Sequence, residues 1–172
     1  MRKEIYKGPI FTLEQFEVEI NNNKYIRDVL KHAPAVAILV KQDDQFIFVK
    51  QLRYGIMKDT LEIPAGLIDQ NESPLDACSR ELQEEIGLKP LNLIHLYSLY
   101  ATPAYCDEIV YIYYCDNFEE CHLPQDDDEQ IEIVKMTLDE VLNELNNPNT
   151  LFDMKTIIAI QHYLLKIKPD KF

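Results

Sequence analysis

The sequence is short of positive charge. Its 172 residues include 17 lysines and arginines against 30 aspartates and glutamates, giving a formal net charge of −13 and a pI of about 4.6. The negative electrostatic field around a chain of this charge repels phosphodiester backbones and anionic membranes. The composition therefore predicts neither a nucleic-acid partner nor a membrane partner. A small phosphorylated ligand would need a local cation, an arginine or a bound metal, to reverse the field inside a cleft.

The sequence also lacks paired metal-binding motifs and long apolar runs. Its 4 cysteines have no CxxC spacing and its 4 histidines no paired-ligand spacing, which argues against a zinc site or a disulfide scaffold. The N-terminal stretch MRKEIYKGPIF has no apolar signal region, and no apolar run approaches ~18 residues. We therefore expect a protein retained in the reducing cytoplasm.

Apolar patterning predicts more strands than helices. The first part of the chain alternates apolar and polar residues around Gly8-Pro9 and residues 21–23, which is typical of antiparallel strands. The run Ala35–Val40 is almost entirely apolar and is predicted to be a strand buried on both faces. Further strands are expected at 46–50, 59–66, 91–100, 108–115 and 131–136.

Three segments carry helix signals. The first begins with Ser73 as N-cap and Pro74 at the first helical position, and stops at Gly87. The second is expected from Thr137 to about residue 146, and the third over about 151–166. The third carries an apolar stripe through Ile157, Ile158, Ile160, Leu164 and Leu165. Because strands outnumber helices in a mixed order, we predict an α+β fold with a mixed sheet and helices on its faces.

The first of these helices is crowded with carboxylates. At about 100° per residue, Leu75, Cys78, Leu82 and Ile86 form one apolar stripe, and Glu81 and Glu85 share an edge beside it. One interpretation is a solvated acidic face with an Arg80–Glu84 pair. The other is a site for Mg²⁺ or Mn²⁺, because these ions prefer carboxylate and carbonyl oxygens and a Pro-Ala-Gly turn precedes the helix.

The complete pattern resembles the Nudix box. Gly66, five residues, Glu72, seven residues and then RELQEEIGL from Arg80 to Leu88 match every defining position. The resemblance implies the Nudix fold, an α/β/α sandwich around a mixed sheet, and hydrolysis of a nucleoside diphosphate linked to another group. It implies a Mg²⁺ or Mn²⁺ site held by Glu81, Glu84, Glu85 and the carbonyl of Ala65. Glu84 would also be catalytic, Arg80 would orient the glutamates, and Glu72 would be structural.

Three further stretches resemble the ADP-ribose pyrophosphatase subfamily: 27–39, 48–66 and 100–108. Pro103 lies sixteen residues beyond Gly87, as in that subfamily, but Ala104 stands where it commonly has glycine. The resemblance implies that the substrate is bound by Arg27, Arg53, Glu62, Pro103, Tyr105 and Glu108. The plainer interpretations are solvated surface arginines, a proline that stiffens its loop and an aromatic residue in the core.

A mobile acidic loop supplies the general base in this subfamily, and DDDEQIEIV places Glu129 at the corresponding position. Alternatively, this acidic stretch is a solvated loop without a catalytic role. Glu108 is the next candidate for the general base. The predicted reaction is hydrolysis of ADP-ribose to AMP and ribose 5-phosphate.

Three rival interpretations stay open: a pyrophosphatase for another nucleoside diphosphate sugar such as ADP-glucose or GDP-mannose, a non-catalytic ADP-ribose-binding module, and an inert acidic protein. Residues 1–33 resemble the subfamily's dimerisation element and 34–172 its hydrolase domain, which predicts a homodimer.

Overall fold

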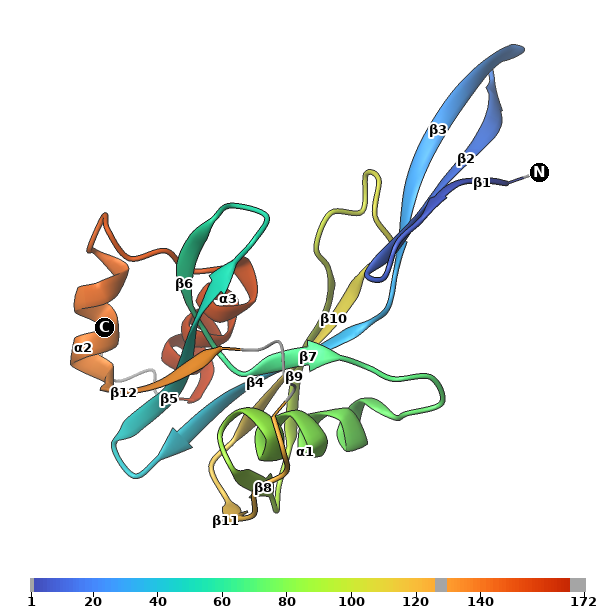
Figure 1. The fold of residues 1–172 in the computed structure, drawn as a ribbon. Coiled ribbons are helices and arrows are strands. Elements are labelled where there is room, and N and C mark those ends of the chain that lie inside the picture. The colour runs from blue at the N-terminus through green and yellow to red at the C-terminus, as the bar shows by residue number, and fades with distance from the viewer. Residues whose placement is uncertain (1, 126–129, 168–172) are drawn as a thin grey trace.

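The chain forms a mixed sheet with helices on both faces and a separate three-stranded arm (Figure 1). The computed structural model describes residues 2–125 and 130–167. The strands are β1 (Lys3–Lys7), β2 (Phe11–Ile20), β3 (Asn23–His32), β4 (Ala35–Gln42), β5 (Gln45–Arg53), β6 (Lys58–Glu62), β7 (Ala65–Leu67), β8 (Leu88–Pro90), β9 (Ile94–Tyr100), β10 (Ile109–Cys115), β11 (Phe118–Glu120) and β12 (Ile131–Thr137). The helices are α1 (Pro74–Glu85), α2 (Leu138–Leu145) and α3 (Met154–His162), followed by a π-helical turn, η1 (Tyr163–Ile167).

The central sheet has the strand order β12-β5-β4-β10-β9, with β6 paired to β5 and β7 to β4. β10 runs parallel to β4 and the other pairs are antiparallel, so the sheet is mixed, as predicted. β4 pairs with β7 through 35–37 and with β5 through 40–42, so both lie along the same edge of β4. A cavity opens where β5 and β6 diverge from β7.

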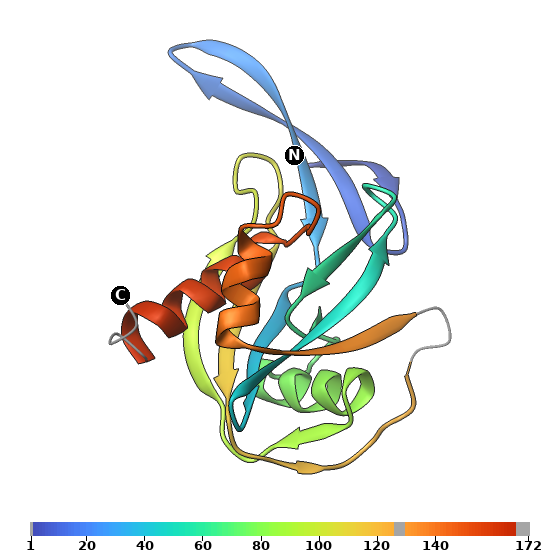
Figure 2. The same ribbon diagram turned by 90° about the vertical axis from the view of Figure 1, so that its left-hand side faces the viewer.

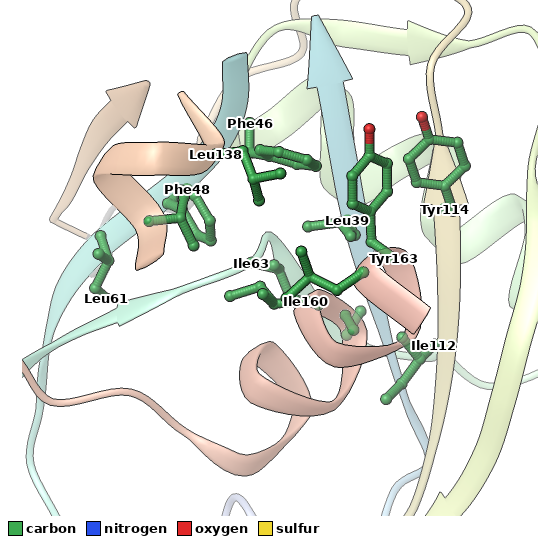
Figure 3. Close-up of a cluster of buried hydrophobic side chains, with 14 residues drawn as sticks. Leu39, Phe46, Phe48, Leu61, Ile63, Ile112, Tyr114, Leu138, Ile160 and Tyr163 are labelled. Carbon is green, nitrogen blue, oxygen red and sulfur yellow. The ribbon is translucent and has the colours of Figure 1, made fainter. Parts of the chain in front are cut away.

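The central strand β4 separates two apolar cores. Ala37 and Leu39 belong to a core covered by α2, α3 and η1, whereas Val36, Ile38 and Val40 belong to a core that includes side chains of α1. Figure 3 shows the first core, where side chains from the sheet meet those from the C-terminal helices. The alternation confirms that this strand is buried on both faces.

The predicted helix starts are found for α1 and α2, but α3 begins later than predicted. Ser73 accepts the Asp76 N–H at 3.2 Å, and Thr137 forms a capping box in front of α2. The start predicted near Leu151 is wrong because the Asp153 carboxylate caps the Thr156 N–H at 3.0 Å, so the helix begins after Asp153.

Two predicted stripe residues are exposed. Leu75 is 53% exposed and Leu165 is 62% exposed. On α1 the reason is that the buried residues are Ala77, Cys78, Glu81, Leu82 and Glu85. The buried arc is therefore rotated by about 60° toward the glutamate edge, which leaves Leu75 outside it. The short strands β8 and β11, which pair with each other, were not predicted.

The N-terminal strands β1, β2 and β3 form a sheet of their own, which extends away from the central sheet as an arm (Figures 1 and 2). The base of the arm is fixed to the loop before β10, because the Leu30 N–H donates to the Tyr105 carbonyl at 2.7 Å and the Asp107 N–H to the Leu30 carbonyl at 3.1 Å. Large apolar side chains along the arm are 44–55% exposed: Ile5, Tyr6, Ile20, Tyr25 and Ile26. The arm therefore presents apolar surface that residues 2–125 and 130–167 leave exposed.

No helix among residues 2–125 and 130–167 is long and apolar enough to cross a membrane.

Candidate active site

The cavity between β5–β6 and β7 brings most of the predicted site residues together. Its volume is about 800 Å³. The predicted residues that line it are Arg53, Glu62, Ala65, Arg80, Glu81, Glu84 and Glu108. A second cavity of about 760 Å³, beside β5, β6 and β12, contains none of the predicted site residues. The first cavity is therefore the candidate site.

Glu81 and Glu85 both lie against β7, as their shared helix edge predicts. The Ala65 N–H donates to Glu85 Oε2 at 3.1 Å. Gly66 packs so closely on Glu81 that a Cβ at this position would lie 2.0 Å from the carboxylate carbon. A side chain at position 66 would therefore force the Glu81 carboxylate or β7 to move, whereas the backbone angle of Gly66 does not itself demand glycine. Glu81 and Glu85 are only 8% and 3% exposed.

Arg80 is the counter-ion of the α1 carboxylates. Its Nε and Nη2 donate to the two oxygens of Glu72 at 2.9 and 3.0 Å, and its Nη1 donates to Glu81 at 2.6 Å and Glu84 at 2.9 Å. A further bond from Nη2 reaches the Leu67 carbonyl at 2.8 Å. The hydrogen bonds with Glu72 raise the pKa of Arg80 above its usual value and lower that of Glu72. The structure thus contains the Arg80–Glu84 ion pair that was expected for a solvated acidic helix face, but this pair is part of a wider network of hydrogen bonds.

The oxygen-rich donor set of α1 suits a hard divalent cation in its chemistry. Carboxylate oxygens from Glu81, Glu84 and Glu85 are the ligand type that Mg²⁺ and Mn²⁺ prefer. Within the part of the chain that the structure describes, however, no three Asp, Glu, His or Cys side chains converge closely enough to hold an ion. Arg80 donates to Glu81 and Glu84 and the Ala65 N–H donates to Glu85, so an ion would have to share these carboxylates with donors of the protein.

The opposite wall of the cavity carries a second charged cluster. Glu62, 2% exposed, accepts from Arg53 Nε and Nη2 at 2.7 and 2.6 Å, from the Thr60 hydroxyl at 2.6 Å and from the Lys155 ammonium. Burial raises the pKa of Glu62, but the bonds from Arg53 and Lys155 outweigh burial and hold the pKa well below its usual range. Lys155 and its second partner, Asp153, were not predicted as site residues. The only signal for them in the sequence is their position near the start of the third predicted helix.

Not every predicted residue reaches this cavity. Glu108 lines it, with His32 Nδ1 3.8 Å from Glu108 Oε1. Arg27 lies on the arm, with its guanidinium 5.5 Å from the centre of the Tyr25 ring. Pro103 and Tyr105 lie in an exposed turn before β10 and do not line the cavity. Glu129 lies outside the described residues. The roles assigned to these residues stay predictions.

Comparison with known proteins shows the family of this chain. Residues 31–156 match the NUDIX domain. An ADP-ribose pyrophosphatase of Bacillus subtilis (strain 168) is 34% identical over 169 residues, covering 96% of this chain and 91% of the relative. A methanol dehydrogenase activator of Bacillus methanolicus is 30% identical over 168 residues, which cover 95% of this chain and 90% of the relative. A crystal structure of an ADP compounds hydrolase superposes with a TM-score of 0.83 at 24% sequence identity. The superposition covers 96% of this chain and 92% of the other.

The chain therefore belongs to the Nudix family. It is a hydrolase with the Nudix fold, and ADP-ribose pyrophosphatases are among its relatives. This confirms the resemblance carried by the Gly66–Leu88 box and the predicted fold class.

Proposed function

We propose that this Nudix hydrolase cleaves the diphosphate of ADP-ribose to AMP and ribose 5-phosphate in a Mg²⁺-dependent reaction. The observation that carries the proposal is one cavity of about 800 Å³ that is lined both by Glu81 and Glu84 of α1 and by Arg53 of β5. The 34% identity with an ADP-ribose pyrophosphatase over nearly the whole chain supports this substrate.

In the proposed reaction, the oxygen of a water forms a bond to one phosphorus while the bond from that phosphorus to the bridging oxygen breaks. The bridging oxygen leaves with the other phosphate, and the water's proton passes to a base, for which we propose Glu129. Glu81, Glu84, Glu85 and the carbonyl of Ala65 would hold Mg²⁺, or Mn²⁺ in its place. When bound, such an ion supplies positive charge against the diphosphate and lowers the pKa of water.

The residues of the chain would orient the reacting groups. Arg80 donates to both Glu81 and Glu84, which restricts the positions of the two carboxylates. Arg53 also lines the cavity; Glu62 accepts from its Nε and Nη2, and the further N–H donors of a guanidinium suit phosphate oxygens. These local charges reconcile an anionic substrate with a chain whose net charge is −13.

Incubation of the protein with ADP-ribose and Mg²⁺ in H₂¹⁸O tests the proposal. We expect AMP and ribose 5-phosphate by mass spectrometry, with ¹⁸O in only one of the two, which identifies the phosphorus attacked. Removing the divalent ion with EDTA is expected to stop turnover. Faster hydrolysis of GDP-mannose or ADP-glucose would overturn the choice of ADP-ribose. Tight binding of ADP-ribose without any product would instead favour a non-catalytic module.

We also propose that the protein is a cytoplasmic homodimer formed through the arm of residues 1–33. The exposed apolar side chains of β1–β3 support an interface there, and the 4 cysteines are free thiols, as in a reducing compartment. In such a dimer, Arg27 would contact the substrate in the cavity of the partner protomer.

Replacing Ile26 with glutamate is expected to convert the dimer to monomers, because the substitution buries a charge in the proposed interface. Sedimentation equilibrium measures the change. Leu91→Glu is the matched control, since Ile26 and Leu91 are both 55% exposed and Leu91 lies outside the arm. If Ile26→Glu and the parent protein have the same mass in solution, the arm is not the interface.

A further inference from the structure

Glu62 is already saturated with hydrogen-bond donors from the protein. Arg53 supplies two N–H groups, Thr60 a hydroxyl and Lys155 an ammonium, and the carboxylate is only 2% exposed. Two carboxylate oxygens have about four lone-pair sites, so these four donors use the acceptor capacity of Glu62. An ionised carboxylate in this state has no proton to donate and little room to accept from a ligand. Glu62 therefore acts as a fixed anion, whose hydrogen bonds hold the side chains of Arg53 and Lys155 in place.

Lys155 is unlike the paired lysines on the surface of this protein. Its side chain is 16% exposed, whereas the side chains of Lys31, Lys50 and Lys89 in their ion pairs are 42%, 45% and 48% exposed. It lines the cavity together with Arg53. It is the one lysine among those lining residues.

The start of α3 fixes the position of Lys155. Asp153 caps the helix through Oδ1, which accepts the Thr156 N–H, and its Oδ2 accepts from the Lys155 ammonium. The Thr156 hydroxyl accepts the N–H of Ile63 at 2.9 Å, which ties the helix to the segment between β6 and β7. Lys155 therefore approaches the cavity from a rigid element.

The ammonium of Lys155 retains one donor. A lysine ammonium has three N–H bonds, and within the described residues two of them are directed at Glu62 and Asp153. The third is free for an oxygen of a bound ligand. A buried ion cluster also adds little net stability compared with apolar residues of similar volume, so stability alone does not account for charges at this wall.

We infer that Lys155 is a further substrate-binding residue, donating to an oxygen of the substrate's diphosphate, and that Glu62 is the positioning residue for both Lys155 and Arg53. This rests on the proposed hydrolysis of a nucleoside diphosphate sugar. Among the lining residues, α1 contributes Glu81 and Glu84 together with Arg80, which already donates to both, so Arg53 and Lys155 are the other side-chain cations that the cavity offers to a diphosphate. In this proposal Glu62 acts through Lys155 and Arg53, in place of the direct substrate contact that the sequence predicts for it.

Steady-state kinetics of Lys155→Met, Lys155→Arg and Lys89→Met test the inference. Methionine keeps most of the apolar stem and removes the charge, and Lys89 is a control because it pairs with Glu119 at 3.3 Å outside the cavity. We expect Lys155→Met to lower kcat/KM by about 10- to 100-fold, the effect of one charge-assisted hydrogen bond, mainly through KM. Arginine should restore most of the loss, and Lys89→Met should match the parent protein.

Thermal unfolding of each variant separates binding from stability. A loss of kcat/KM that arginine does not restore, and that only follows a loss of folded protein, would show that Lys155 is structural and overturn the inference. Unchanged kinetics in Lys155→Met would do the same. The assays use whichever nucleoside diphosphate sugar the parent protein hydrolyses fastest. A different preferred sugar therefore refutes only the ADP-ribose proposal and leaves the role of Lys155 to its own result.

Discussion

Replacing Glu85 with glutamine is expected to reduce kcat by more than about 100-fold, beyond the effect typical of residues that only support a metal ligand. Glutamine keeps the volume and one acceptor oxygen, so the Ala65 N–H retains a partner, but the charge that would attract a divalent ion is lost. Glu85 is 3% exposed, so bulk solvent has little access to compensate for the lost charge. Measuring kcat over a Mg²⁺ titration, together with the unfolding temperature, tests the expectation.

The control for Glu85→Gln is Glu119→Gln, which removes the same charge from a residue whose side chain is 54% exposed and pairs with Lys89. It should retain parental activity. Near-parental turnover of Glu85→Gln at saturating Mg²⁺ would contradict the proposed metal site. A large fall in its unfolding temperature would instead indicate that the carboxylate mainly supports the fold.

Substituting alanine for Gly66 is expected to abolish most activity and to lower the free energy of unfolding by about 1–3 kcal/mol, the usual cost of overpacking. The new methyl group would lie 2.0 Å from the Glu81 carboxylate carbon, so either β7 or Glu81 must shift. A shift of Glu81 would also disturb its bond with Arg80. Chemical denaturation and the rate of ADP-ribose hydrolysis measure the two effects.

Gly55→Ala is the matched control for stability, because a Cβ at Gly55 meets no atom within 4 Å. It should leave the free energy of unfolding within about 0.5 kcal/mol of the parent value, as at most surface positions. If Gly66→Ala were as stable and as active as the parent protein, the close packing of the box glycine on Glu81 would have no functional meaning.

Local patterns in the sequence predicted much of this site. The edge shared by Glu81 and Glu85 follows from helix geometry alone, and Ser73 and Pro74 set the helix start that puts this edge against β7. The burial of 35–40 on both faces likewise follows from a continuous apolar run. These features depend on residues close together in the chain.

Other features depend on contacts that no local pattern specifies. Lys155 and Glu62 are 93 positions apart, and nothing in the spacing of the third helix marks Lys155 as part of the site. The rotation of α1 was missed for a related reason. Apolar periodicity counts glutamates as exposed, but Glu81 and Glu85 are buried here because Arg80 and the Ala65 N–H satisfy them.

The position of Arg80 has a consequence for assembly of the enzyme. Because one guanidinium already donates to Glu72, Glu81 and Glu84, these carboxylates have a counter-ion within the chain, and we expect the chain to fold without a divalent ion. Loading would then be a late adjustment of side chains on a finished scaffold, in contrast to small metallo-domains whose folding waits for their ion.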